Sequence, residues 1–280
     1  MGKWLSGQVV KSILLFLFCL LLLPAASSGL IVPERLEYDL TLADITVGSM
    51  SLETAQKEPY VQLESKGSSA GWVSLFYEVD DHVVSLLEKK QLEALPLTFS
   101  FVPAFSKVRI REGGNRAEKE FAFDYAKKTI AYSDDIKHEK ANISLKDLVF
   151  DALSALYYMR HIPLIPGTSV ALNIFNKKQL YKTEVKVLKK ESLHTSFGAI
   201  NTVLLRTNMD GAGDGVFYYP GDIYIWLSDD ERRIPVLIEK KLKPLLEGKI
   251  PAVIKKTMPD FLLKKITGAS VRAVIVRSKK

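Results

Sequence analysis

Residues 221–242 constrain the fold of this chain more than any other stretch. Ile223 to Leu227 is apolar at every position, which predicts a strand with both faces buried. Residues 234–242 carry apolar side chains at alternate positions, and the charged residues 228–233 between them are typical of a tight turn. A hairpin with one arm buried on both faces needs a large sheet around it, either closed or strongly curved.

Much of the remaining chain also alternates between apolar and polar residues, as half-buried strands do. Gly113, Gly114 and Asn115 separate two such runs and indicate a hairpin. Residues 72–77 fit a short helical turn better than a strand. We expect further strands at 36–40, 45–52, 60–66, 79–87, 97–101, 107–112, 116–124, near 132, and at 170–175, 181–188, 200–207 and 270–276.

One long helix is predicted over residues 144–161. Ser144 and Asp147 have the spacing of a capping box, apolar residues follow at helical intervals, and Pro163 ends the helix. We expect this helix to pack on or in the concave side of the sheet. The predicted fold is therefore mainly β, a strongly curved or barrel-like antiparallel sheet around one helix.

Residues 1–28 have the parts of a secretory signal peptide. Lys3 and Lys11 precede an apolar run, and Ala26 to Ser28 fits a small-residue cleavage site before Gly29. We expect export to the periplasm, with residues 29–280 forming a single β-rich domain. The alternative is an inner-membrane anchor left uncleaved, although this apolar run is shorter than the roughly 18–20 residues that span a bilayer comfortably.

Composition excludes several classes of function. The only cysteine, Cys19, lies in the predicted signal peptide, so the mature chain has no disulfide, thiol nucleophile or thiolate metal site. The net charge of +7 is spread along the chain and lacks the dense basic stripe of proteins that bind nucleic acid, so no nucleic acid is expected as a partner.

Residues 243–268 interrupt the run of strands before the last one. Pro251 and Pro259 suit first helical positions, and apolar residues lie opposite lysines, as in a kinked basic amphipathic helix pair. Such helices bind anionic membrane surfaces, or they cap the open end of their own sheet with the lysines in solvent. The sequence leaves both readings open.

Five motifs in succession resemble a known family. They lie at 33–40, 95–99, 123–124, 151–160 and 225–235, and the last two, DALSALYYMR and IWLSDDERRIP, are the most specific. The chain in this respect is similar to the exported bacterial family called domain of unknown function DUF3108. The resemblance implies an envelope protein with a mainly antiparallel β fold. It implies no activity and no catalytic residue, and residues 243–268 depart from the family pattern.

Aromatic side chains are the candidate ligand contacts. They could line a concave apolar pocket for lipid or acyl chains, whereas the alternative is that they fill the interior of the sheet as core. The candidate ligand-binding residues are Trp72, Phe76, Tyr77, Tyr157, Tyr158 and Trp226.

Catalytic and metal-binding motifs are missing from the sequence. The four histidines lie far apart, no nucleophile elbow, metalloprotease motif or phosphate loop is present, and Asp210 and Asp214 lack the other ligands of a calcium loop. No catalytic residue, metal or cofactor is therefore expected. Residues 229–233 could be an acid–base cluster or a turn with local ion pairs, and Arg232 or Arg233 folding back toward Asp151 would make it a structural latch.

The leading hypothesis is a non-enzymatic envelope protein that binds an apolar or amphiphilic ligand, such as a lipid, or a partner chain in the hollow of a curved sheet. An envelope hydrolase would instead need two carboxyl groups roughly 5–10 Å apart in one pocket. A docking module would need no pocket at all. The sequence gives no indication of the ligand's identity or of the oligomeric state.

Overall fold

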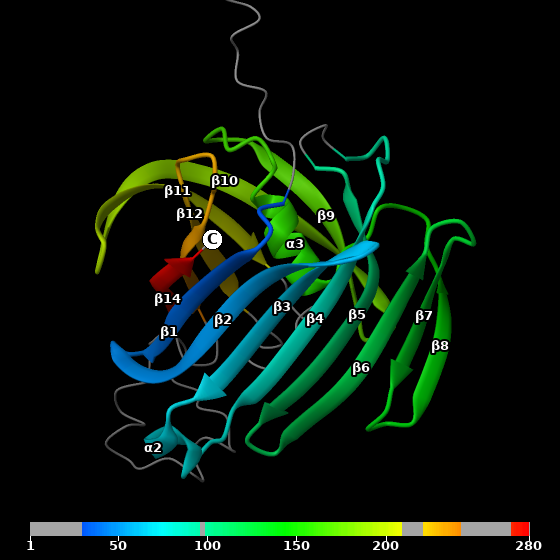
Figure 1. The fold of residues 1–280 in the computed structure, drawn as a ribbon, viewed down its shortest axis with the longest axis horizontal. Helices are drawn as coiled ribbons and strands as arrows, with labels where there is room; N and C mark the ends of the chain where they lie inside the picture. Colours follow the sequence, from blue (N-terminus) through cyan, green and yellow to red (C-terminus); the bar gives the residue numbers. More distant parts are fainter. Residues whose placement is uncertain (1–29, 96–98, 209–220, 242–269, 280) are drawn as a thin grey trace, which may run out of the picture.

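One antiparallel sheet of fourteen strands curls around the helix α3. Figure 1 shows the computed structural model, which describes residues 30–95, 99–208, 221–241 and 270–279. The predicted mainly β, strongly curved sheet is confirmed. The elements are β1 (Glu34–Leu42), β2 (Ile45–Lys57), β3 (Tyr60–Ser69), α2 (Gly71–Ser74), β4 (Asp80–Lys89), β5 (Phe101–Glu112), β6 (Asn115–Asp124), β7 (Thr129–Asp134), β8 (Glu139–Ser144), α3 (Ala152–Met159), β9 (Ser169–Asn176), β10 (Gln179–Thr195), β11 (Gly198–Asn208), β12 (Asp222–Ser228), β13 (Pro235–Lys241) and β14 (Ser270–Lys279).

Two meanders and the last strand make up the sheet. Its order is β8-β7-β6-β5-β4-β3-β2-β1-β14-β13-β12-β11-β10-β9, so β14 lies between the first strand of the chain and β13. The two halves of the chain are thus joined along β14, which pairs with β1 from Arg35 to Leu42 and with β13 from Leu237 to Lys241. The strands at the two ends of the sheet are β8 and β9.

The hairpin that the sequence predicts most strongly is confirmed as β12 and β13. Ile225 pairs with Ile238 at its centre, and both side chains belong to the main hydrophobic core. Ser228 begins the turn, and its hydroxyl accepts a hydrogen bond from the backbone N–H of Ile234. The α2 turn and the hairpin of β5 and β6 across Gly113 are also confirmed.

The predicted helix over 144–161 is wrong in its first half. Ser144 ends strand β8, and α3 begins only at Ala152. Asp151 is the true cap, because it accepts hydrogen bonds from the backbone N–H groups of Leu153 and Ser154. The capping box pairs Asp151 with Ser154, and the predicted one at Ser144 and Asp147 does not form.

Residues 145–150 are not helical because they make two different tertiary contacts. Leu145 and Val149 bury themselves among the aromatic residues of a second cluster beside β6 and β7. Phe150 pairs with the edge of β9, donating its N–H to the carbonyl of Asn173 and accepting from the N–H of Phe175. Helical spacing of apolar residues is therefore met here without a helix, because tertiary contacts outweigh local pattern.

Asp151 gives α3 a pH dependence that can be measured. Burial raises the pKa of Asp151 above its ordinary value of 3.8, although hydrogen bonds from Ser85 and Ser154 oppose the shift. The folded chain then binds this proton more tightly than the unfolded chain, so the stability contributed by this group falls as pH rises through the window above 3.8. Urea unfolding at a series of pH values should show the free energy of unfolding of the wild type, minus that of Asp151→Asn, decreasing as pH rises.

The exposed Asp147→Asn is the matched control for that measurement. The free energy of unfolding of the wild type, minus that of Asp147→Asn, should not decrease as pH rises. A wild-type minus Asp151→Asn difference that stays constant, or grows with pH, would show that burial does not govern this carboxyl group.

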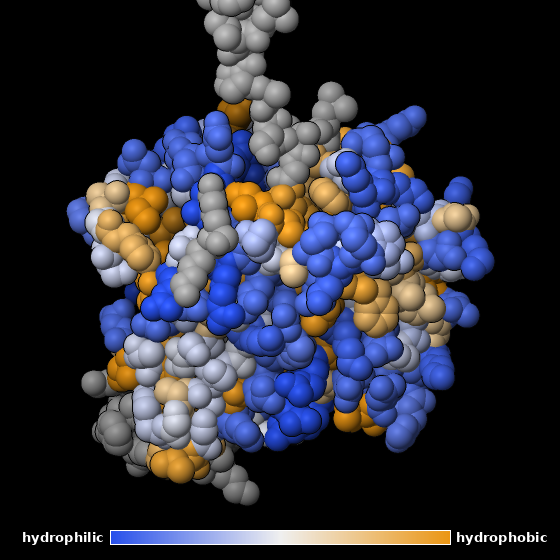
Figure 2. Space-filling view, viewed as in Figure 1, coloured by the Kyte–Doolittle hydropathy of each residue, from blue (hydrophilic) through white to orange (hydrophobic). Residues whose placement is uncertain are grey.

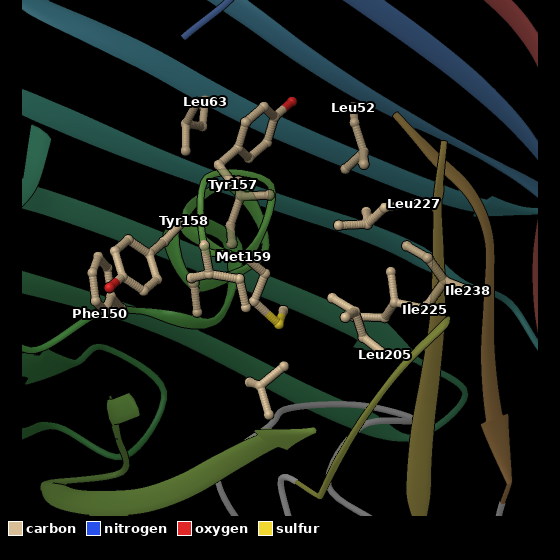
Figure 3. Close-up of a cluster of buried hydrophobic side chains, with 14 of the residues drawn as sticks. Leu52, Leu63, Phe150, Tyr157, Tyr158, Met159, Leu205, Ile225, Leu227 and Ile238 are labelled. Atoms are coloured by element: carbon tan, nitrogen blue, oxygen red, sulfur yellow. The ribbon is translucent and has the colours of Figure 1, made fainter. Parts of the chain in front are cut away.

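The main core lies between the two walls of the curved sheet. Figure 3 shows α3 between Leu52 and Leu63 on one wall and a group from β11 to β13 on the other. Tyr157 points toward the first wall and Met159 toward the second, so one helix serves both. The group on the second wall is Leu205, Ile225, Leu227 and Ile238.

A second cluster brings the two ends of the sheet together. The Phe175 ring on β9 lies edge-on to the rings of Phe121, Phe123 and Tyr132, at centroid distances of 5.2, 6.3 and 6.3 Å. Beside it, Lys178 forms an ion pair of 2.8 Å with Glu139 of β8. The sheet is thus closed into a barrel-like shape by side chains at this seam.

A buried ion network ties four distant segments at the C-terminal end of α3. Arg160 makes two hydrogen bonds to the carboxylate of Glu34, at 2.7 and 3.0 Å, and Arg232 approaches the same carboxylate at 3.3 Å. Arg232 also donates to the hydroxyl of Ser278. Arg233 donates to the carbonyls of Arg160 and of Ile162, a favourable place for a cation at a helix end. The latch therefore exists, but its acid is Glu34 and not Asp151.

Several predictions differ from the structure or fall outside it. Strand β8 was not predicted, and one strand, β5 from Phe101 to Glu112, stands where two were predicted at 97–101 and 107–112. Residues 97 and 98 lie outside the described residues. The last strand is confirmed and runs on to Lys279. The signal peptide at 1–28 and the helical insertion at 243–268 lie outside the described residues. Within the described residues no helix is both long and apolar enough for a membrane span.

Candidate functional site

The six aromatic residues predicted to contact a ligand lie in three separate places. Trp72 and Phe76 belong to the α2 segment and are 42% and 40% exposed, together with Leu75 at 80%. Figure 2 shows a hydrophobic patch at α2, on a face that is otherwise largely hydrophilic. Tyr77 lies against Gly113, where a Cβ atom would come within 3.0 Å of its ring.

Tyr157 and Tyr158 are part of the packed core. The Tyr158 ring lies 5.4 Å from Phe99 and 4.7 Å from Phe150, measured between ring centroids. The Arg160 guanidinium lies 5.1 Å from the centre of the Tyr157 ring. The Tyr157 hydroxyl is buried without a hydrogen-bond partner.

Trp226 lies on the outer face of the sheet. It alternates with Ile225 and Leu227, whose side chains enter the main core, and its indole N–H donates to Glu191 at 2.8 Å. The six residues therefore do not form one pocket. Contact between any of them and a ligand stays a prediction.

The structure outlines a different site, a groove beside β10 and β11. The last described pair of these two strands is Val185 with Thr207, and the Thr183 hydroxyl still reaches the carbonyl of Asn208 one residue further on. β10 also pairs with β9 from Gln179 to Lys186, and β11 pairs with β12 up to Asn208 and Asp222. The groove has a volume of about 440 Å³. Its lining residues are Tyr181, Lys182, Thr183, Glu184, Lys186, Arg206, Thr207, Asn208 and Asp222.

Strand alternation gives this groove an inner and an outer side. Thr183 and Thr207 share the face of Val185 and Leu205, which are buried in the main core. Tyr181 packs against that same core. The charged side chains of the lining come from the opposite, outer face of β10 and β11. The groove is therefore amphipathic, with a charged rim and a less polar inner wall.

Two cations of the rim have no ion-pair partner. Lys182 and Arg206 lie on different strands, and neither has a carboxylate within ion-pair distance in the part of the chain that the structure describes. Lys186 differs, because its ammonium lies 3.1 Å from Glu184. Hydrogen bonding from Ser169 and then from Lys186 lowers the pKa of Glu184, so this carboxyl group is held ionised.

Thr207 is the most unusual residue of the lining. Its side chain is 3% exposed, and its hydroxyl has no hydrogen-bond partner. The neighbouring Thr183 hydroxyl, in contrast, donates to the carbonyl of Asn208 at 3.1 Å. A buried hydroxyl without a partner is costly, by about 1–3 kcal/mol, and the Tyr157 hydroxyl of the core is another such group.

Sequence reasoning missed this groove, although it predicted both strands. Lys182, Glu184 and Lys186 alternate along β10 in a way that any solvent-facing strand does. The only local signal is that Thr207 and Asn208 come just before a glycine-rich stretch of the kind that ends strands.

Comparison with known proteins places the chain in a family. A family model described as "Protein of unknown function (DUF3108)" matches residues 37–244. This chain belongs to that family. The DUF3108 match runs from β1 to β13, and it contains α3 and the whole groove, while β14 lies beyond it.

One solved structure supports the fold of the DUF3108 chain. A beta-barrel-like protein of domain of unknown function DUF1849 from Brucella abortus is similar, with 11% identity and a TM-score of 0.52 over 90% of this chain and 98% of that one. A structure described as a "putative lipoprotein from Parabacteroides distasonis" has 11% identity and a TM-score of 0.31, over 88% of this chain and 95% of its own. No curated protein matches the sequence.

Proposed function

We propose that the protein is a non-enzymatic binding protein of the bacterial envelope, and that it holds an amphiphilic ligand in the groove between β10 and β11. One observation carries the proposal: Lys182 and Arg206, two cations without an ion pair in the described part of the chain, line one groove. The groove volume of about 440 Å³ falls in the range of small-molecule sites, roughly 300–1,000 Å³.

The amphipathic walls favour a ligand with both a polar and an apolar part. The rim offers charged side chains, and the inner wall leads through Tyr181 to the main core. An apolar tail would therefore lie along the inner wall while its polar end met the rim. The sequence pattern of residues 1–28 supports the envelope as the compartment.

Hydrolysis is less well supported by the same groove. Two carboxyl groups line it, Glu184 and Asp222, but a glycosidase needs one of its two acids protonated, with a raised pKa. The pKa of Glu184 is lowered. Asp151 has a raised pKa, but it is fully buried and bonded to Ser85 and Ser154 at the start of α3. A pure docking module, in turn, leaves the groove unexplained.

Native mass spectrometry tests the proposed function. The chain expressed with its signal peptide and purified after export is mixed with dodecyl phosphate, dodecanoate or dodecyl maltoside. We expect a one-to-one complex with at least one of them, and hydrogen exchange should then slow in residues 181–186 and 206–208. No complex with any of the three, or protection confined to other strands, would overturn the proposal.

A further inference from the structure

We infer that the groove is selective for an anionic, oxygen-rich group, a phosphate or a carboxylate, held by Arg206 and Lys182. The inference deepens the proposed function and rests on it for the place of the ligand. It names the chemistry of the polar end, which the amphipathic walls alone leave open.

Lys182 and Arg206 lack ion pairs, whereas other lysines of β10 have them. Further along β10, Lys189 forms an ion pair with Glu191 and Lys190 forms one with Asp229, both at 2.8 Å. Inside the groove Lys186 is paired with Glu184 in the same way. Lys182 on β10 and Arg206 on β11 therefore remain without an ion pair in the described residues, although the charge of Arg206 also helps to lower the pKa of Glu184. An anion in the groove would meet both cations.

Thr207 does not belong to this anion site. It follows Arg206 in β11 and faces the main core, so its buried hydroxyl lies on the other side of the sheet from the two cations. A bound phosphate or carboxylate would therefore be held from the outer face, where charge-assisted hydrogen bonds from Lys182 and Arg206 meet its oxygens.

Asp222 provides a test of opposite sign, because its carboxylate opposes the binding of an anion. This carboxylate lines the groove at the start of β12, and in the described residues it has no ion-pair partner. Its negative charge must weaken the binding of any anion nearby. Removing this charge should therefore tighten binding, which is the opposite of what removing either cation should do.

The test measures dissociation constants by isothermal titration for dodecyl phosphate, dodecyl maltoside and inorganic phosphate. Arg206→Ala and Lys182→Ala should each weaken the binding of dodecyl phosphate about 10-fold or more, as expected for hydrogen bonds to a charged group. Asp222→Asn should tighten it. Thr207→Val should leave the affinity unchanged and the protein at least as stable, because the hydroxyl it removes is buried on the other face of the sheet and has no partner.

Lys189→Ala is the matched control, since it removes the same charge from the same strand outside the groove. It should leave the affinity unchanged. Inorganic phosphate distinguishes the two sources of the anion. If inorganic phosphate displaces dodecyl phosphate, a free anion is sufficient for binding. If binding requires the dodecyl chain, the anion is a lipid headgroup. Both results support an anion site.

Two results would overturn the inference. If dodecyl maltoside binds as tightly as dodecyl phosphate, and neither Arg206→Ala nor Lys182→Ala affects dodecyl phosphate, the groove has no preference for anions, although the proposed amphiphile binding stands. If no probe binds, the inference and the proposed function fail together. Binding of inorganic phosphate without any amphiphile, lost in Arg206→Ala, would retain the anion site and remove the amphiphile.

Discussion

Glu34→Gln is expected to lower the free energy of unfolding by about 3–5 kcal/mol, because it leaves a buried cation without its counter-charge. The side chain of Glu34 is 0% exposed and that of Arg160 is 5% exposed. Burial alone would lower the pKa of Arg160, but the hydrogen bonds and the charge of Glu34 raise it. The pKa of Arg160 thus reports how strongly this carboxylate stabilises the guanidinium.

Urea unfolding measures the effect as a shift in the midpoint at unchanged slope. Glu53→Gln is the matched control, because Glu53 forms an ion pair of 2.9 Å with Arg35 and the Arg35 side chain is 49% exposed. Exposed pairs contribute about 0–1 kcal/mol, so this control should lose little. Equal losses in the two variants would contradict the assigned role of the buried network.

A double substitution separates the two possible roles of the network. Glu34→Leu with Arg160→Met replaces the ion pair by apolar side chains of similar length, and such replacements are often neutral or stabilising. We expect the double variant to recover most of the stability that Glu34→Gln loses. Recovery would mean that the pair fixes how α3, β1 and the β12–β13 turn meet, and that the charges themselves add little to stability.

The strands could be predicted from sequence where the pattern is local. Ile223 to Leu227 is apolar throughout because one face meets the main core and the other carries Trp226, bonded to Glu191. Gly113 has a φ of +54°, which explains why a glycine marks that hairpin. In both places the residues that form the structure are adjacent in the chain, so pattern and structure agree.

Prediction failed where distant segments decide the outcome. Leu145 and Val149 have helical spacing, but the second cluster, which includes Phe175, holds them in an extended segment. The acidic partner of the turn arginines was expected at Asp151, next to the helix. The structure has Glu34 in that role, which is 126 positions from Arg160 in the sequence. Nothing local in either stretch reports these partners.

The groove was beyond prediction for a similar reason. Its two cations come from different strands, Lys182 from β10 and Arg206 from β11. A lysine or an arginine on the outer face of a strand is ordinary in sequence. Only the structure shows that these two line one groove and have no ion pair within the described residues.

The seam that closes the sheet should be the second most sensitive place in the protein. Phe175→Ala is expected to cost about 3–5 kcal/mol, the range for removing a large aromatic side chain from a core. The side chain is 1% exposed and contacts three aromatic rings of β6 and β7. β8 and β9 are not neighbours in the sheet order, so these rings, together with the backbone bridge from Phe150 to β9, hold the two ends of the sheet together.

Hydrogen exchange distinguishes the closing of the seam from a general loss of stability. In Phe175→Ala, amides of β6, β7 and β8 should exchange faster than those of β1, β2 and β14. The outer strands lose their contacts with the second cluster, whereas the central strands keep their contacts with the main core. Phe197→Ala removes a phenylalanine that is 56% exposed, and it should change stability by no more than about 0.5 kcal/mol. Equal acceleration in all strands of Phe175→Ala, or a loss no larger than that of Phe197→Ala, would mean that the barrel-like shape is held elsewhere.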